Sequence, residues 1–470
     1  MTGPAPAAPD PSTPYRKRGP RLTNRPVGVT LWTLAWPTTI GLFSVLAFNI
    51  IDTLYIGRLG AIELAAIGFC FPVILTLGSV AFGLSAGATA VMSQTIGAGD
   101  EAGLRRTATN ALVLIIAVTL GFAALGLATI DPLFTLLGAE PGVIAHIRRY
   151  MTVYYAGLPV VLSPIILQGF MRATGETLIP SAVMVAGAAT NAMVSPLLIF
   201  GLLGFPRLEI AGAAWGTLAA RSTMTAAAFL LVHFREHLFD FRVSVLKAFW
   251  PSVKGVLAIG VPAVATQVIT PLSSAVLTRL LSGWGQDVVA AFAVGARLEA
   301  LFLIPFWALQ GGVAPFVGQN YGAGRHDRLK ETERWIWRFA LGWGATALVA
   351  ALLIGRIMTG FFTRDPAIAA MSAHYFAYAT AGFFGAGLML ASASVFNSLS
   401  RPTIATGVVA LRFIGFYIPL GIVFSRMNGP EGVFAATSIS YLAAGIVGAF
   451  MVRRTLARLP AYSALNKTAT

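Results

Sequence analysis

Two acidic residues lie inside long apolar stretches, where an acid can do chemistry that it cannot do in water. Nearly all of the 18 Asp and Glu residues fall in polar segments or at the ends of apolar stretches, but Asp52 and Glu299 do not. An ionised carboxylate inside a membrane costs a few kcal/mol or more, and burial favours its protonated form. We therefore expect Asp52 to load and unload a proton. The alternative is a permanent pair with a buried arginine such as Arg221.

Residues near Asp52 can assist this chemistry. Tyr154 and Tyr155 offer hydroxyl groups to such an acid or to a substrate, and they also suit the aromatic belt of a membrane interface. Pro37 precedes Asp52 by about four helical turns and removes a backbone hydrogen bond, so it is a candidate hinge. Ordinary packing near the start of a helix explains this proline equally well.

Other buried polar residues keep two interpretations. Glu299 follows Arg297 by two residues, a spacing that puts them on different faces of a helix. Glu299 either satisfies a buried polar network or lines a substrate cavity. Gln168 is a cavity residue or a hydrogen-bonding residue between packed helices, and the same choice applies to Gln94 and Gln319.

The composition predicts an integral membrane protein to position these residues. The chain of 470 residues is 56% hydrophobic and 11% charged, with a mean hydropathy of +0.76. Twelve apolar stretches are long enough to cross a bilayer as helices. They are expected over residues 31–56, 64–92, 108–130, 151–171, 178–203, 210–232, 255–281, 288–313, 336–360, 374–398, 403–425 and 432–452.

The distribution of the basic residues reflects the orientation of these spans in the membrane and does not indicate a surface that binds nucleic acid. The formal net charge is +15, and with a cytoplasmic N-terminus 22 Lys and Arg fall on the inner side against eight on the outer side. This imbalance obeys the positive-inside rule. We expect both termini in the cytoplasm, a multi-pass protein of the cell (inner) membrane, and no nucleic-acid partner. The lone Cys70 excludes an intramolecular disulfide.

An internal duplication divides the chain. One constant shift along the sequence places Pro37 on Pro262, Gln94 on Gln319, and residues 97–99 (GAG) on 322–324 (GAG). Six spans return the chain to the same side, so the halves are parallel repeats related by an axis along the membrane normal. The fold predicted is all-α, with twelve transmembrane helices as two six-helix repeats around a central cleft, which is typical of transporters.

The duplication sets the domain limits that we expect. They are a disordered basic tail at 1–28, an N-terminal lobe at 29–235, a cytoplasmic linker at 236–254, a C-terminal lobe at 255–455 and a cytoplasmic tail at 456–470.

Three runs of residues resemble one transporter family. They are DTLYIGRLGAIELAA at 52–66, RATGET at 172–177 with Asn191 downstream, and GQNYGAG at 318–324. Together they are similar to the multidrug and toxic compound extrusion (MATE) family over about residues 30–455. The resemblance implies a cation-coupled antiporter, not an enzyme, that expels amphipathic and often cationic drug-like molecules by alternating access.

The resemblance also implies an ion-coupling site. In the DinF-like branch the acid matching Asp52 works with an asparagine and a second aspartate on the fifth span and a threonine on the sixth. Asn191 and Thr217 match, but Ser195 replaces the second aspartate. Fewer carboxylates suit a hard monovalent cation less well, so we favour protons over sodium. No other cofactor and no metal site is expected.

The acids of the NorM-like branch are absent from the seventh and tenth spans, which leaves Asp52 as the coupling group. A flippase for a lipid-linked oligosaccharide is the alternative, with Arg221, Arg297 and Arg412 as the candidate basic residues for a diphosphate. A membrane-embedded transferase is less well supported, since the loop at 233–254 offers only two acids. We expect a monomer.

Overall fold

The computed structural model describes residues 22–459, and this part of the chain is helical without any strand. The helices of the first half are α1 (Val27–Gly57), α2 (Ala61–Ala98), α3 (Glu101–Leu136), α4 (Pro141–Ala156), α5 (Leu158–Ala173), α6 (Leu178–Phe200) and α7 (Ile210–Leu230), with short turns η1 (Leu202–Gly204) and η2 (Leu231–Arg235). Those that follow are α8 (Val243–Lys247), α9 (Phe249–Ser282), α10 (Gln286–Gly322), α11 (His326–Gly360), α12 (Pro366–Ala381), α13 (Phe383–Ser398), α14 (Pro402–Ala410), η3 (Leu411–Tyr417) and α15 (Ile418–Ala457).

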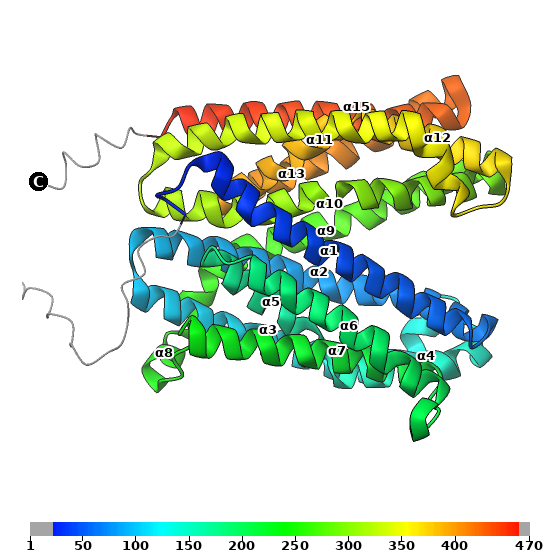
Figure 1. Ribbon diagram of the computed structural model, residues 1–470, viewed down its shortest axis with the longest axis horizontal. Coiled ribbons are helices and arrows are strands. Elements are labelled where there is room, and N and C mark those ends of the chain that lie inside the picture. The colour runs from blue at the N-terminus through cyan, green and yellow to red at the C-terminus, as the bar shows by residue number, and fades with distance from the viewer. Residues whose placement is uncertain (1–21, 460–470) are drawn as a thin grey trace, which may run out of the picture.

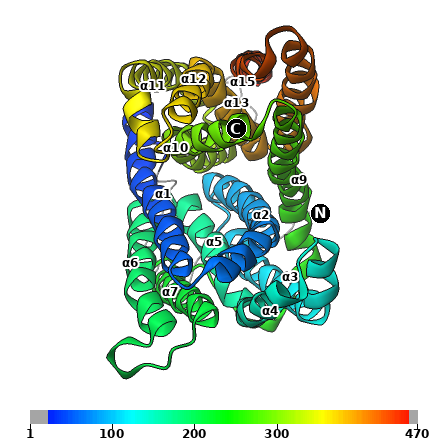
Figure 2. The same cartoon turned by 90° about the vertical axis from the view of Figure 1, so that its right-hand side faces the viewer.

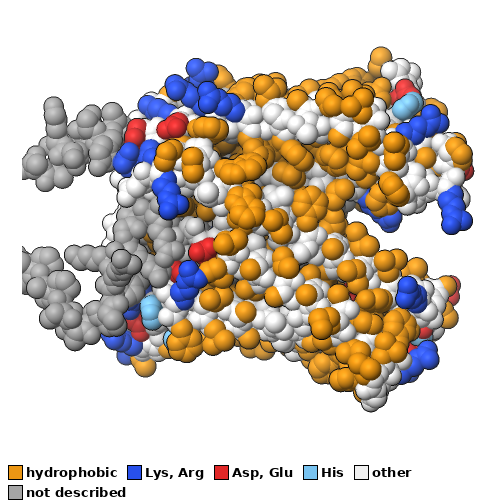
Figure 3. Space-filling view, viewed as in Figure 1, with side chains coloured by type: hydrophobic (Ala, Val, Ile, Leu, Met, Phe, Trp, Pro, Cys, Tyr) orange, Lys and Arg blue, Asp and Glu red, His pale blue; other side chains and the backbone are white. Residues whose placement is uncertain are grey.

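The helices form two lobes, one from each half of the sequence. Figures 1 and 2 show α1 to α7 in one lobe and α9 to α15 in the other. On the face shown in Figure 3, apolar side chains cover the broad middle of the molecule, and charged side chains gather toward its two ends. This surface suits a protein whose middle faces hydrocarbon.

The helices account for the spans that the sequence predicts. Eight helices are long and apolar enough to cross a membrane, and two bent pairs raise the number to ten. The helical stretch Pro402–Ala457 is interrupted by non-helical backbone at Asn428 and Gly429, so it comprises two spans. With α7, which has 21 residues, twelve segments result.

Two of the predicted spans are bent, which the apolar pattern did not indicate. The pairs α4 with α5 and α12 with α13 are each bent by 53°. The breaks fall at Gly157 and Gly382, which the shift between the repeats superimposes. At both glycines a Cβ would collide with a neighbouring helix, since it would lie 2.5 Å from Leu218 and 2.7 Å from Ser438. The repeat therefore preserves a bend as well as a helix count.

The duplicated GAG runs also have a structural explanation. Gly99 and Gly324 adopt φ angles of 75° and 69°, in the left-handed region that suits glycine at the end of a helix. Gly97 and Gly322 allow close contact between backbones, because a Cβ on either would lie 2.1 Å from a carbonyl oxygen of the other lobe. Each run thus ends a helix and packs it against its repeat-related partner.

The lobes meet at one end of the molecule, where α1 begins and α15 ends, which we call the terminal end (Figure 1). The start of α1 belongs to the hydrophobic core of the second lobe through Leu31 and Leu34. In the same way, the start of α9 joins the core of the first lobe through Val253 and Val256. Each lobe therefore holds the first helix of the other.

The lobes separate toward the opposite end, which we call the distal end. Figure 3 shows a hollow between them on its right-hand side. Gly83 on α2 packs against Gly260 on α9. Thr76, seven residues and about two helical turns from Gly83 on the same face of α2, is exposed, and so is Gln267, seven residues from Gly260 on α9. These positions line a cleft that is open at the distal end and closed at the terminal end.

The expected domain limits need two corrections. Residues 22–28 do not form a disordered tail: Leu22 is buried, its backbone N–H donates to Gln319 Oε1 at 3.1 Å, and α1 begins at Val27. The expected linker at 236–254 contains α8, and α9 begins at Phe249. Residues 1–21 of the expected N-terminal tail and 460–470 of the C-terminal tail lie outside the described residues.

Candidate ion-coupling site

Asp52 lies in the distal part of α1, where this helix packs against α6 of the same lobe. The Asp52 side chain is half-buried, and its Oδ1 atom is enclosed. It lies beside the side chain of Asn191 on α6. One turn along α1, the Tyr55 hydroxyl donates to the Ala192 carbonyl at 3.3 Å and fixes α1 against α6. The repeat-related position in the second lobe holds Leu277, so the acid belongs to one lobe alone.

The matched polar residues on α6 and α7 gather around this carboxyl group. Asn191 Nδ2 donates to Ser195 Oγ at 2.8 Å, one turn along α6. Ser195 in turn packs against Gly216 on α7, where a Cβ would lie 2.2 Å from Ser195 Oγ. This close packing brings Thr217 into the same region of the lobe. Asn191, Ser195 and Thr217 are all buried.

Three oxygen atoms of this group have no hydrogen-bond partner among the described residues. They are Oδ1 of Asp52, Oδ1 of Asn191 and Oγ1 of Thr217, and each is enclosed. A buried acceptor without a partner costs free energy. The set fits an added proton on the carboxyl group, a water molecule or a small cation. It contains one carboxylate, and no group of three or more His, Cys, Asp or Glu residues suited to a metal occurs in the part described.

Two tyrosines of α4 adjoin this site: Tyr154, which is a candidate from the sequence, and Tyr150, which is not. Tyr150 lies beside Thr217 and within electrostatic range of Asp52. Tyr154 stacks on Tyr150, with ring centroids 6.2 Å apart. The spacing i, i+4 places both on one helix face and was the available signal. Tyr155 faces another way, because its ring packs against Gly126 on α3, which corrects the expectation that it lines the cavity.

Arg221 completes the polar group of the first lobe without neutralising the acid. Its guanidinium lies 5.6 Å from the centroid of the Phe48 ring, and it is close to Tyr154. Within residues 22–459, Arg221 makes no ion pair with Asp52, and its buried Nε atom has no partner. The permanent pair considered as an alternative is therefore not formed in this conformation.

The second lobe holds a separate buried network around Glu299. Its carboxylate accepts hydrogen bonds from the hydroxyl of Tyr375 and, at 2.8 Å, from that of Tyr441. Arg412 lies 3.4 Å from the centroid of the Tyr441 ring and adds a compensating positive charge. Glu299 thus joins α10 to α12 and α15 inside the lobe. This placement agrees with the first of the two interpretations, a buried polar network, and not with a place for Glu299 in the substrate cavity.

Three other residues have positions that bear on function. Gln168 is buried on α5 and makes no hydrogen bond to the Asp52 group within the described part of the chain. Pro37 is buried inside α1, which continues through it as a helix.

Arg297 is exposed on α10, on the face that turns toward α1 and α2. That face is identified by Gly311, about four turns along, which packs against Thr38. Arg297 is therefore an exposed basic residue within the span of α10.

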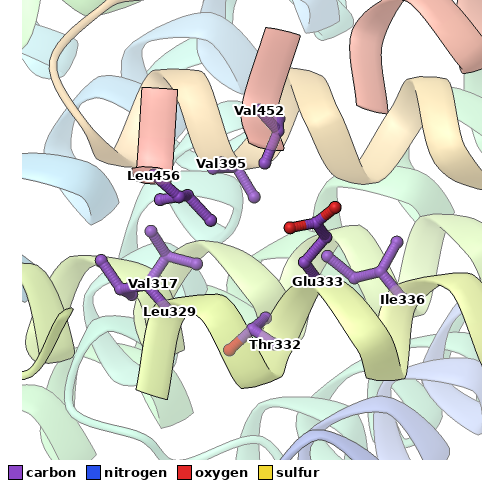
Figure 4. A pocket seen from close by; sticks show the side chains of 8 residues that line it. All are labelled: Val317, Leu329, Thr332, Glu333, Ile336, Val395, Val452 and Leu456. Atoms are coloured by element: carbon purple, nitrogen blue, oxygen red, sulfur yellow. The ribbon is translucent and has the colours of Figure 1, made fainter. Parts of the chain in front are cut away.

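A small pocket near the terminal end does not suit a drug-sized ligand (Figure 4). Its cavity volume is about 10 Å³, the room that about one water molecule needs. It lies inside the second lobe and is lined by Val317, Leu329, Thr332, Glu333, Ile336, Val395, Val452 and Leu456.

Comparison with known proteins assigns the family. The MatE family model matches residues 37–197 and 262–423. The FAD transporter of Shewanella oneidensis is 30% identical over 92% of this chain and 96% of its own. The multidrug export protein MepA of Staphylococcus aureus is 25% identical over 90% and 93%.

Solved structures agree with these relatives. The crystal structure of a variant of the Vibrio cholerae MATE transporter VcmN has a TM-score of 0.87 at 26% identity and covers 93% of this chain and 98% of its own. The bent form of VcmN has a TM-score of 0.86. The family match falls on both halves of the chain, as the duplication requires. The chain belongs to the MATE family of membrane transporters.

Proposed function

We propose that this transporter exports amphipathic organic compounds in exchange for protons, and that Asp52 is the group that carries the proton. The observation that carries this proposal is the position of Asp52 inside one lobe, beside buried oxygen atoms that have no partner among the described residues and with no ion pair to a basic residue there. A carboxyl group placed in this way changes its protonation state when its surroundings change.

Protons are favoured over sodium because of the composition of the site. The group around Asp52 supplies neutral oxygen atoms from Asn191, Ser195 and Thr217 and a single negative charge. A hard cation gains from each additional carboxylate in its coordination shell. Ser195 supplies a hydroxyl group in place of a second carboxylate, and this hydroxyl already accepts a hydrogen bond from Asn191. Sodium remains the competing ion, and transport driven by a sodium gradient alone would contradict this choice.

The sidedness follows from the charges at the two ends. The positive-inside rule puts the terminal end in the cytoplasm, so the cleft of this conformation opens to the outside. In the cycle that we propose, Asp52 takes up a proton from the outside, the substrate leaves through the cleft, and the protonated carrier returns inward. Pro37 suits a hinge in this cycle, because it separates the part of α1 that packs on the second lobe from the part that carries Asp52.

The driving force limits what one proton can do. Each pH unit supplies about 1.36 kcal/mol per proton, which is about tenfold in accumulation. Exchange of one proton for one monovalent cation moves no net charge, so the membrane potential adds nothing. Export of such a cation should therefore follow the pH gradient and ignore an imposed potential.

Reconstituted transport tests the role of Asp52. Efflux of a fluorescent cation from proteoliposomes under a pH gradient should be abolished in Asp52→Asn. A matched control is Asp131→Asn, because Asp131 is a half-exposed acid of the same lobe that pairs with Arg148 at the distal end. That control should transport at the rate of the wild type. Undiminished proton-driven transport by Asp52→Asn would remove this residue from the mechanism.

A second candidate substrate is an anionic aromatic compound such as a flavin dinucleotide. The S. oneidensis relative is named an FAD transporter, and the exposed Arg297 of α10 offers a guanidinium suited to a diphosphate. Export of an anion together with proton entry moves charge. An inside-negative potential should therefore favour this export. Each elementary charge that moves across 100 mV adds about 2.3 kcal/mol to the driving force.

Transport of FAD and of a cationic dye in the same proteoliposomes separates the two candidates. If FAD is the substrate, a potassium diffusion potential should change its rate, and Arg297→Gln should reduce FAD transport more than dye transport. If only the dye is transported, and its transport rate does not depend on the membrane potential, the substrates of this protein are cationic compounds.

A further inference from the structure

Two glutamines reach from one lobe to the other at the terminal end. Gln94 lies near the end of α2, and its Nε2 atom donates to the Ser398 carbonyl at 2.6 Å and to Ser400 Oγ at 3.0 Å. Both acceptors belong to the second lobe, where α13 ends. Gln94 therefore ties the first lobe to the second.

Gln319 makes the reciprocal contact. It lies near the end of α10 in the second lobe and is fully buried. Its Nε2 atom donates to the Ala173 carbonyl at 2.7 Å, at the last residue of α5 in the first lobe. The shift that superimposes Gln94 on Gln319 also superimposes the acceptor Ala173 on the acceptor Ser398. The two hydrogen bonds are thus related by the internal repeat.

Backbone contacts surround these hydrogen bonds and close the cleft. An added Cβ on Gly97 would lie 2.1 Å from the Gln319 carbonyl oxygen, and one on Gly322 would lie 2.1 Å from the Gln94 carbonyl oxygen. One turn earlier on each helix, Ser93 faces Gly318. Ser93 is completely buried. The ends of α2 and α10 therefore leave no room for water between the lobes here.

The segment before α1 adds a third tie on one side. Gln319 Oε1 accepts from the Leu22 amide, and the Leu22 carbonyl accepts from Asn320 Nδ2 at 3.3 Å. Arg328 on α11 also donates to the carbonyls of Leu22 and Arg25. The amide oxygen and nitrogen of the Gln319 side chain are thus both used while the cleft is closed at this end.

We propose that Gln94 and Gln319 form the cytoplasmic gate of the transporter, as two repeat-related hydrogen-bonded ties that must break when the cleft opens at the terminal end. The proposal rests on alternating access in the proposed function, because a gate has meaning only if the cleft opens on both sides. Both ties are neutral amide–carbonyl hydrogen bonds, which water replaces at small net cost when the lobes part. Such ties hold one conformation without trapping it.

The size of the effect follows from this exchange with water. Loss of one such bond should raise the population open at the terminal end by about two- to tenfold. The two glutamines lie on adjoining helix ends of one interface, so their effects are coupled, and the double variant should open this end more than either single variant.

Labelling of a cysteine at position 93 measures the opening. Cys70 is the only cysteine of the chain, so Ser93→Cys in a Cys70→Ala protein carries one thiol, which is buried while the gate is closed. The probe is a membrane-impermeant maleimide added to the terminal side of vesicles, without substrate or pH gradient. Labelling should become about two- to tenfold faster in Gln94→Ala and in Gln319→Ala, and faster again in the double variant.

Three comparisons make the outcome decisive. Gln310→Ala is the matched control, because Gln310 lies on α10, nine residues before Gln319, and its side chain makes no hydrogen bond to the first lobe within residues 22–459. Gln94→Asn and Gln319→Asn keep the amide but shorten its reach, so they should behave like the alanine variants while protecting the fold. Unchanged labelling in the glutamine variants, at thermal stabilities equal to that of Gln310→Ala, would overturn the gate. Failure of Asp52→Asn to affect transport would leave these rates untouched and would count only against the coupling proposal.

Discussion

Replacement of Gly322 by alanine should push the protein out of the conformation described above. The new Cβ would lie 2.1 Å from the Gln94 carbonyl oxygen and 3.1 Å from the Ala98 amide nitrogen, both backbone atoms of the other lobe. Backbone atoms cannot yield as a flexible side chain can, so α2 and α10 must separate by about 1 Å. Overpacking of this kind costs about 1 to 3 kcal/mol. The balance should therefore shift toward opening at the terminal end by about 5- to 150-fold.

Distances between spin labels at the terminal end report this shift. Arg106 and Lys330 are exposed there on different lobes, and Arg106→Cys with Lys330→Cys in a Cys70→Ala protein provides the label pair. Gly322→Ala should add or enlarge a population at longer distance. Gly342→Ala is the matched control, because a Cβ at this glycine of α11 meets nothing within 4 Å. If both variants give the distance distribution of the parent protein, the close packing of α2 on α10 does not hold the closed end.

Two further substitutions test other parts of the account. Glu299→Leu leaves the hydroxyls of Tyr375 and Tyr441 without their acceptor, so it should lower the free energy of unfolding by about 1 to 3 kcal/mol; a melting temperature equal to that of the wild type would contradict the network. Ser195→Asp restores a second carboxylate beside Asn191 and should make transport respond to a sodium gradient without a pH gradient, whereas a variant that still ignores sodium would show that carboxylate number does not choose the ion.

Much of the architecture follows from the sequence because helices in hydrocarbon obey simple limits of length and polarity. The duplication adds information that no single span contains. The shift that superimposes the two GAG runs predicts equivalent environments, and Gly97 and Gly322 indeed pack against each other's lobes. The position of Asp52 inside a span likewise indicated an acid enclosed by protein.

Contacts between segments far apart in the sequence could not be predicted in the same way. The bends at Gly157 and Gly382 depend on a close approach by neighbouring helices, which hydropathy does not register. Tyr150 lies four residues before Tyr154 and stacks on it, whereas the adjacent Tyr155 points about 100° away, so a pair of neighbouring tyrosines in the sequence does not form one face of the site. The binding of Leu22 to the second lobe was hidden by the polar, proline-rich composition of the segment before it.

Each glutamine could be a cavity residue or a hydrogen-bonding residue between packed helices, and only the structure distinguishes the two. Gln94 and Gln319 are related by the repeat, which predicts that they do the same thing but not what they do. Their partners are backbone carbonyls at the ends of α13 and α5, and a carbonyl leaves no signature in a sequence. Only the side-by-side placement of the lobes shows that both bonds cross the same interface.

Proton release on substrate binding tests the central claim most directly. Purified protein in a weakly buffered solution with a pH indicator is titrated with a lipophilic cation at a pH where Asp52 is protonated. If the cation and the proton compete through Asp52, the wild type should release about one proton per cation bound, by linkage, and Asp52→Asn should release none. Equal proton release by the two proteins at equal cation binding would show that the exchange does not pass through this carboxyl group.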